Sequence, residues 1–350
     1  MILLFAGAGA SKAVDPQQYP TTVEFFARLP QHVTADDLFA RAVEYLTLKD
    51  KTGPIDIEQV LWLIGDLREF IGKASDSSTI PGWFIEGNRL SSAVGSREDL
   101  GAILNVANIA KSKIQALASR INECVYDLYR DPPSEDQLKN NWIPLFDGLM
   151  VHKHPIEVVT TNYDIVIEEA IEYAKAPVLT GRTRGTQPIL DKTLWEFKAL
   201  SATTFMTQGR LTKLHGSVDW IRGGDRIYVG NPLFHGQHER HAIIYPGFKG
   251  QPTDDLFQVF HRYFQAKISE ADIIIFIGYA FRDEYINRIL STEISKETKL
   301  VVINPEGHLP NIPFPPQSYS HLKSYFDMDT VHEVLSFLGP RLARPYGESS

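Results

Sequence analysis

The stretch ADIIIFIGYAF, residues 271–281, runs directly into RDEYINRIL, residues 282–290. The first segment is apolar at almost every position, which predicts a strand that is buried on both faces. The second segment repeats its apolar residues at helical spacing, with charged residues between them. A buried strand followed by a helix is typical of a parallel sheet that is covered by helices on both sides.

The same pattern of short apolar runs, some followed by a predicted helix, recurs elsewhere in the chain. IEVVTTNYD at residues 156–164 precedes the helical pattern IVIEEAIEYA at residues 165–174, and KLVVINPE at residues 299–306 is a further apolar run. The apolar residues 2–5 would add another strand to the same sheet. We therefore predict an α/β fold with a doubly wound parallel sheet, Rossmann-like in its architecture, and with a helical insertion.

The pattern also predicts how the chain is divided. Residues 1–22 and 151–340 are expected to form one domain built on the parallel sheet. Residues 23–150 are predicted to be a mostly helical insertion packed on it, because apolar residues recur there at helical spacing. Asp56 is placed to cap the first long helix of this insertion. Residues 341–350 are expected to be a flexible tail.

Composition indicates an ordinary globular protein, with 350 residues, 43% hydrophobic and 22% charged. No Lys or Arg precedes the short apolar run at residues 2–6, so we expect no secretory signal. The apolar run at 273–281 is too short to cross a membrane. The single cysteine, Cys124, excludes a disulfide framework and a cysteine-only zinc cluster, and it fits the reducing cytoplasm, where we expect the protein to act.

The charge distribution bears on the kind of ligand. The net charge of −8 argues against general nucleic-acid binding, which usually requires a basic surface. Between Thr180 and Arg226, however, eight basic residues stand against four acidic ones. Such a local basic island suits a compact anionic ligand, and it is equally consistent with an ordinary solvated face.

In a covered parallel sheet, ligands bind at the edge where the carboxyl ends of the strands meet. Segments at five predicted strand ends carry glycines or polar side chains: GAGAS (7–11), TTNYD (160–164), KLHGSVDW (213–220), IGYAFRDE (277–284) and INPE (303–306). Gly7 and Gly9 would let the backbone approach a phosphate closely, and Ser11 would add a hydroxyl donor. Lys12 stands where the dinucleotide fingerprint has its third glycine, so a purely structural turn is the alternative.

Two further segments offer polar side chains. Asn162 and Asp164 would present an amide and a carboxylate to an amide-bearing ligand, although Asp164 could instead cap the following helix. His215 is followed by Gly216, which leaves its imidazole uncrowded and suited to a general base. The alternative is a histidine that is merely packed or exposed.

The last two segments resemble parts of a nucleotide site. Gly278 ends a buried strand and would form a second anion-binding turn. Asn304 and Glu306 follow the last strand, where a carboxylate can accept hydrogen bonds from ribose hydroxyls. Plain turns are the alternative for both segments.

A histidine cluster raises the question of a metal. His235, His238 and His241 are three residues apart and could hold zinc, but Gly236 argues against a regular helix and no fourth ligand is evident. A solvated loop accounts for these residues better. We predict no metal site and no structural zinc.

Taken together and in this order, the five segments resemble the sirtuin family, and more closely its bacterial sirtuin-like NAD-hydrolase branch than the protein deacylases. The resemblance covers residues 2–12 and about 156–306. It implies a sirtuin-type Rossmann fold with NAD as substrate. It also implies a role in bacterial anti-phage defence, with a partner ATPase or another defence protein. Because an unrestrained NAD hydrolase would exhaust its own cell, we expect homo-oligomerisation or such a partner to restrain it.

The resemblance further implies one NAD site shared by all five segments. Its implied catalytic residues are Asn162, beside the nicotinamide ribose, and His215, the catalytic histidine. The residues implied to bind the rest of NAD are Gly7, Ala8, Gly9, Ser11, Asp164, Gly278, Asn304 and Glu306.

Within this set, the glycine segment 7–11 would hold the pyrophosphate and Gly278 would approach the phosphates. Asp164 would take the carboxamide of nicotinamide. Asn304 and Glu306 would hold the adenosine ribose.

Two departures from the deacylases decide the implied reaction. Deacylase sirtuins carry a four-cysteine zinc module and an Asp-Phe-Arg segment, whereas this chain has only Cys124 and reads VDPQQYPTTVEFF at residues 14–26. The implied activity is therefore NAD hydrolysis to nicotinamide and ADP-ribose, with formation of a cyclised product left open. A protein deacylase, an ADP-ribosyltransferase and a non-enzymatic NAD or ADP-ribose sensor are the alternatives.

Overall fold

The structure is a computed structural model that describes residues 1–49, 55–75, 97–151, 154–196, 209–230, 240–243, 254–309 and 311–342. The chain divides into two compact units. The first unit contains Met1–Thr21, Tyr126–Ile244 and Phe248–Ser350. The second unit contains Thr22–Val125 and Tyr245–Gly247.

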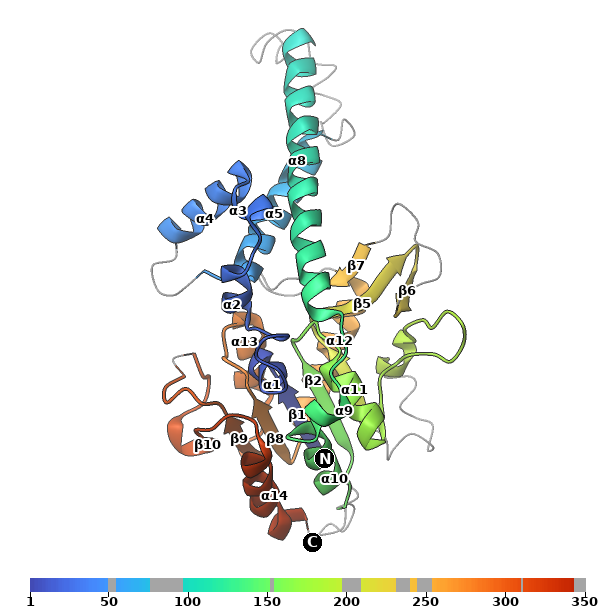
Figure 1. Cartoon of the computed structure of the whole chain (residues 1–350), viewed down its shortest axis with the longest axis vertical. Helices are drawn as coiled ribbons and strands as arrows, with labels where there is room; N and C mark the ends of the chain where they lie inside the picture. Colours follow the sequence, from blue (N-terminus) through green and yellow to red (C-terminus); the bar gives the residue numbers. More distant parts are fainter. Residues whose placement is uncertain are drawn as a thin grey trace. The chain divides into compact units, whose positions relative to one another are not determined.

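A seven-stranded parallel sheet forms the centre of the first unit (Figure 1). Its strands are β1 (Ile2–Ala6), β2 (Ile156–Thr160), β3 (Val178–Leu179), β4 (Gly209–Lys213), β8 (Ile273–Ile277), β9 (Lys299–Ile303) and β10 (Tyr319–Leu322). The order is β10-β9-β8-β1-β2-β4-β3, and every neighbouring pair is parallel. The strand order reverses beside β1, so the predicted doubly wound, Rossmann-like sheet is confirmed.

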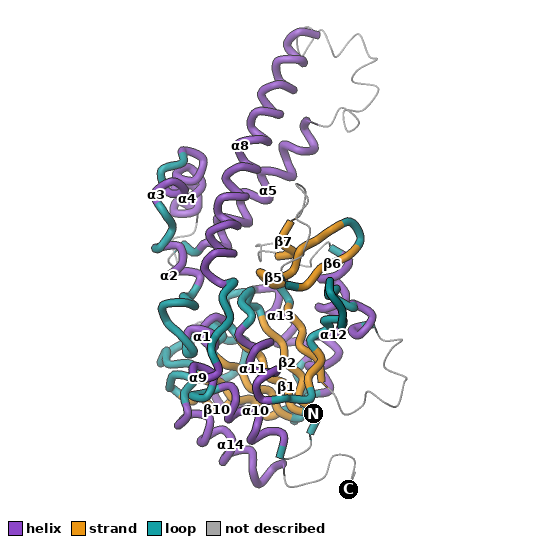
Figure 2. The backbone as a smooth tube through the Cα atoms, turned by 45° about the vertical axis from the view of Figure 1, so that its right-hand side comes forward, coloured by secondary structure: helices purple, strands orange, loops and turns teal. Residues whose placement is uncertain are grey.

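Helices cover this sheet. Those of the first unit are α1 (Ala8–Lys12), α9 (Glu135–Leu138), α10 (Trp142–Met150), α11 (Val166–Ala174), α12 (Asp255–Glu270), α13 (Glu284–Glu293) and α14 (Met328–Leu342). α12 packs against α13, and α10 packs against α11 and α14. Figure 2 shows α12 on one side of the sheet and α10 and α14 on the other.

The burial of the central strands explains their apolar sequence. Every residue of β1, β2 and β8 is buried. Phe5 from β1 lies 5.6 Å, between ring centroids, from both Phe264 of α12 and Phe276 of β8. Strands that are covered on both faces need apolar residues at consecutive positions, which is the pattern that identified them in the sequence.

A small antiparallel sheet follows β4 directly. It consists of β5 (Gly216–Gly223), β6 (Arg226–Val229) and β7 (Arg240–Ile243), with β5 in the centre. This sheet was not predicted from the sequence. A short 3-10 helix, η1 (Lys192–Trp195), precedes β4, and another, η4 (Pro316–Ser318), precedes β10.

The second unit is helical in its described residues. Its helices are α2 (Thr22–Ala27), α3 (Gln31–Thr34), α4 (Asp37–Lys49), α5 (Ile57–Ser75) and most of α8 (Arg97–Tyr129). Asp56 caps α5 as predicted, because its carboxylate accepts from the backbone N of Gln59 at 3.0 Å.

The stretch that was predicted as one insertion, residues 23–150, is shared by the two units. Residues 22–125 belong to the second unit, whereas α9 and α10 pack in the first unit against α11. α14 continues to Leu342, and residues 343–350 of the predicted tail lie outside the described residues. In the part of the chain that the structure describes, no helix has the length and apolar character needed to cross a bilayer.

Candidate active site

The parallel register brings the five predicted segments to one edge of the sheet. Ala6, the last residue of β1, pairs with Thr160 of β2 and with Ile277 of β8. Thr160 pairs with Lys213 of β4, and Ile277 pairs with Ile303 of β9. The loops that follow these five strands therefore leave the sheet side by side, at the edge where such folds bind ligands.

The glycines of the first and fourth segments let two turns pack backbone against backbone. The N–H of Gly7 donates to the carbonyl of Ile277, and that of Gly9 to the carbonyl of Gly278, both at 2.9 Å. A Cβ on Gly9 would lie 2.8 Å from the Cα of Gly278. Gly278 has φ +58, and a Cβ there would lie 2.3 Å from the N of Ala10. This packing requires the glycines whether or not a ligand binds.

Asn162 is buried and held in one orientation. Its Nδ2 lies 2.9 Å from the carbonyl oxygen of Gly7 and 2.9 Å from Oγ of Ser11. Since a carbonyl oxygen only accepts hydrogen bonds, the atom that faces Gly7 must be the amide nitrogen. Both N–H groups are thus used within the protein, and Oδ1 is the remaining polar atom of the amide.

Asp164 is buried beside the same serine. Its Oδ1 accepts from the N of Val166 at 3.1 Å, so it helps to cap α11, and its carboxylate also receives a hydrogen bond from Ser11. Ser11 thereby connects Asn162 to Asp164. Burial raises the pKa of Asp164, and the nearby charge of Lys213 opposes that rise.

His215 lies at the end of β4 and is 3% exposed. Its Nε2 is 3.2 Å from Oδ2 of Asp283, and the ring of Tyr163 lies 6.2 Å away between centroids. The chain turns sharply after His215 because Gly216 has φ +87, where a Cβ would lie 1.9 Å from the carbonyl oxygen of Ala242. The turn leads into β5 and keeps the imidazole at the sheet edge.

Asp283 lies beside His215 and was not among the site residues predicted from the sequence. It precedes α13, and its Oδ1 accepts from the N of Ile286 at 3.0 Å. Burial by itself would raise the pKa of Asp283, but the hydrogen bond and charge of His215 and the N–H of Ile286 hold it below its usual range. The helix cap could have been read from the sequence, whereas the histidine partner is 68 residues away.

The INPE segment is tied to the neighbouring turn. Asn304 is buried, its Nδ2 donates to the carbonyl of Tyr279 at 3.2 Å, and its Oδ1 accepts from the N of Glu306 at 2.9 Å. Glu306 is exposed. The carboxylate of Glu306 therefore faces water while Asn304 braces the loop.

Residues 156–326 match the family model of the SIR2-like domain. This match begins at β2 and runs past β10, so it contains four of the five segments and lacks GAGAS. No curated protein matches the chain.

Solved structures of Sir2 proteins resemble the whole chain at low identity. A Sir2 homologue with NAD is 13% identical, with 97% of this chain and 90% of that chain covered and a TM-score of 0.44. Sir2 with a p53 peptide and NAD⁺ is also 13% identical, with 97% and 94% covered and a TM-score of 0.45. A Sir2 homologue mutant with 2'-O-acetyl ADP ribose is 12% identical, with 99% and 94% covered and a TM-score of 0.43.

A buried lysine links β4 to α11. Lys213 is 1% exposed, and its Nζ donates to the backbone carbonyl of Asp164, to Oε1 of Glu168 at 2.7 Å and to Oγ of Ser217 at 2.8 Å. Burial raises the pKa of Glu168 to about 7, although the charge of Lys213 opposes this rise, and the charge of Asp219 adds to it. The lysine fastens the end of β4 to α11.

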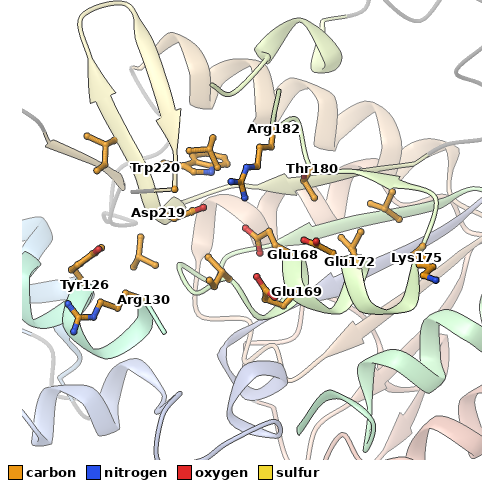
Figure 3. A pocket seen from close by; sticks show the side chains of 18 residues that line it. Tyr126, Arg130, Glu168, Glu169, Glu172, Lys175, Thr180, Arg182, Asp219 and Trp220 are labelled. Atoms are coloured by element: carbon orange, nitrogen blue, oxygen red, sulfur yellow. The ribbon is translucent and has the colours of Figure 1, made fainter. Parts of the chain in front are cut away.

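A cavity of about 530 Å³ in the first unit is lined by residues of α11 and β5. Figure 3 shows Glu168 of α11 and Asp219 of β5 on its walls, with Arg182 beside Asp219. None of the ten predicted site residues lines this cavity.

The described residues contain no group of three or more His, Cys, Asp or Glu side chains that could hold a metal. His235 and His238 lie outside those residues, and His241 falls in β7. The prediction of no metal site and no structural zinc stays a prediction.

Proposed function

We propose that this protein hydrolyses NAD at the bond between nicotinamide and ribose, giving nicotinamide and ADP-ribose. The observation that carries the proposal is the placement of Asn162 and His215. They follow the directly paired strands β2 and β4, at the edge where the turn at Gly7 meets Gly278. The SIR2-like match over residues 156–326 supports NAD as the substrate.

NAD would lie across this edge. The residues proposed to bind it are Gly7, Ala8, Gly9, Ser11, Asp164, Gly278, Asn304 and Glu306. The glycines of the two turns pack against each other, and the turn at residues 7–11 that they shape is proposed to hold the pyrophosphate. The exposed carboxylate of Glu306 can accept from ribose hydroxyls, and Asp164 can accept from the carboxamide N–H groups.

The reaction breaks the C1′–N bond, and the bonding electron pair stays with nicotinamide, which leaves as a neutral base. The ribose passes through an oxocarbenium-like state that water attacks from the opposite face, as in glycoside hydrolysis. Asn162 can orient that water through Oδ1, because its N–H groups are bound to Gly7 and Ser11. His215 accepts a proton from the water as the C1′–O bond forms.

Restraint of this activity is part of the proposal. An unrestrained NAD hydrolase would deplete its own cell, so homo-oligomerisation or a partner is proposed to hold the enzyme inactive. Bacterial anti-phage defence, with an ATPase or another defence protein as partner, is the proposed setting. Both ideas rest on the resemblance of the five segments to the bacterial NAD-hydrolase branch.

The test is to incubate the purified full chain with NAD, alone and with candidate partners, and to follow nicotinamide and ADP-ribose. We expect His215→Ala to lose about a hundredfold or more in rate, the usual contribution of a general base being about 10²–10⁴. Asn162→Ala should also lose most of the activity. His332→Ala and Asn140→Ala change exposed residues and should keep wild-type rates.

Three results would instead support a different function. Consumption of an acetyl-lysine peptide in step with NAD would indicate a deacylase. Release of nicotinamide with ADP-ribose attached to a protein or nucleic acid would indicate a transferase. Binding of NAD with no turnover under any condition would indicate a sensor.

A further inference from the structure

We propose that Asp283 is a positioning residue that keeps a proton on Nε2 of His215, so that Nδ1 is the nitrogen that takes the proton from water. This role rests on the proposed hydrolysis and specifies its base. Nothing in the sequence pairs the two residues, because they follow different strands, β8 and β4.

The carboxylate of Asp283 is held by α13. Its Oδ1 accepts from the N of Ile286 at 3.0 Å, which fixes the plane of the group, and its Oδ2 lies 3.2 Å from Nε2 of His215. The side chains of Asp283 and His215 are 11% and 4% exposed, so little water competes for this contact.

The charge state of Asp283 decides the tautomer of His215. The hydrogen bonds from His215 and Ile286 keep the pKa of Asp283 below its usual range despite burial, so the group is an anion near neutral pH. An ionised carboxylate only accepts hydrogen bonds. Nε2 of His215 must therefore be the donor, and Nδ1 of the neutral ring carries the lone pair.

Nδ1 of His215 is the atom left for chemistry. It is buried, and within the described residues it has no hydrogen-bond partner. A buried polar atom without a partner costs free energy, and such atoms are few in native proteins. A water molecule or a substrate hydroxyl at Nδ1 would satisfy it.

A second histidine strengthens the assignment. His261 of α12 is 2% exposed, and burial, together with the charge of His215, lowers its pKa to about 4. The charge of Asp283 and the backbone of Leu214 oppose this lowering without reversing it, and within the described residues neither nitrogen of His261 has a hydrogen-bond partner of standard geometry. His261 therefore stays neutral near pH 7, and the side-chain contact of Asp283 at hydrogen-bond distance is with His215.

The proton balance follows from this arrangement. One O–H bond of water breaks, its proton forms an N–H bond at Nδ1, and its oxygen bonds to C1′ as nicotinamide leaves with the C1′–N electron pair. His215 is then protonated on both nitrogens, and the carboxylate of Asp283 stabilises that charge. The proton later returns to solvent.

The tautomer can be measured in the full chain by ¹⁵N NMR with labelled histidine, in which protonated and lone-pair nitrogens have well separated shifts. His215→Ala assigns the signals among the 11 histidines. We expect the proton on Nε2 at mildly basic pH in the wild type. In Asp283→Asn and Asp283→Ser, both tautomers should appear. These two variants keep a helix-capping acceptor for Ile286, so α13 should persist.

Kinetics give the second readout. Both Asp283 variants should lose about a hundredfold in kcat with little change in KM. Asp254→Asn is the matched control, because Asp254 caps α12 by accepting from the N of Leu256 at 3.0 Å and binds Arg222 at 2.7 Å. It loses the same charge at a comparable cap and should keep the wild-type kcat.

Two results would overturn the role of Asp283. One is a proton on Nδ1 in the wild type, and the other is a wild-type kcat in both Asp283 variants. The NMR measurement needs no turnover. A chain that shows the Nε2 proton but does not hydrolyse NAD would therefore contradict the proposed function while upholding the effect of Asp283 on His215.

Discussion

The side-chain amide of Asn162 donates to the backbone carbonyl of Gly7 at 2.9 Å, across 155 positions of sequence. This contact joins the loop after β2 to the loop after β1, and a second bond to Ser11 completes the fixation of the amide. Because the amide nitrogen donates both of its hydrogen bonds within the protein, Oδ1 of Asn162 is the atom that we propose to contact substrate or water. The residue is thus both a brace of the site and a candidate participant.

Replacing this amide by a carboxylate tests the bracing role of Asn162 through its effect on stability. In Asn162→Asp, an oxygen would face the carbonyl of Gly7, and the donor to Ser11 would be lost. We expect the free energy of unfolding to fall by about 1–3 kcal/mol, the usual cost of an unsatisfied buried polar group. Urea unfolding measures it, with the exposed Asn140→Asp as control. Equal effects of the two substitutions would contradict the bracing contact.

The packing of the two glycine turns predicts a second stability effect. A Cβ in Gly9→Ala would lie 2.8 Å from the Cα of Gly278, and backbone cannot move aside easily. We expect a loss of about 1–3 kcal/mol. Gly65→Ala in α5 would bring the new Cβ within 4 Å of no atom outside its own helix backbone and chain neighbours, and it should instead gain about 0.5–1 kcal/mol. Thermal or urea unfolding distinguishes these opposite signs.

The buried ammonium of Lys213 pairs with the carboxylate of Glu168, so we expect substitutions at these two residues to be strongly coupled in stability. Lys213→Met would leave the carboxylate of Glu168, which is 20% exposed, without its cation, and we expect the free energy of unfolding to fall by about 1–3 kcal/mol. Adding Glu168→Gln should recover part of that loss, because the uncompensated charge is removed. A double-mutant cycle in urea tests this, and additive effects of the two substitutions would contradict the pair.

Glu168 also predicts a dependence of stability on pH. Burial raises its pKa from the ordinary 4.5 to about 7, so the folded protein binds more protons than the unfolded chain between those values. Stability should therefore fall as pH rises from 4.5 to 7, by about 1–3 kcal/mol. Glu168→Gln should flatten this slope. Glu172→Gln, an exposed position on the same helix, should leave it unchanged.

The sheet could be predicted from the sequence because strands that are buried on both faces have apolar residues at consecutive positions. β1, β2, β8 and β9 are short runs of apolar residues, and the glycines or polar residues that follow them mark the edge that holds the candidate site. Parallel pairing then brings these loops together without further information. The sequence alone therefore predicts that Asn162 and His215 lie at the same edge of the sheet.

The contacts within the edge could not be predicted in this way. Asp283 pairs with a histidine 68 residues away, and no local pattern encodes that distance. Lys213 is 1% exposed, although lysine is almost never buried unless it is paired, so its type indicated a surface residue. β5 was overlooked because its sequence, GSVDWIRG, mixes polar and apolar residues without regular alternation.

The most direct test of NAD hydrolysis is the ratio of free ADP-ribose to nicotinamide formed by the purified full chain from NAD, with no other acceptor present. We expect one ADP-ribose for each nicotinamide, and loss of both products in His215→Ala. Nicotinamide released without an equal amount of free ADP-ribose or a cyclised product, or equal rates in wild type and His215→Ala, would contradict it.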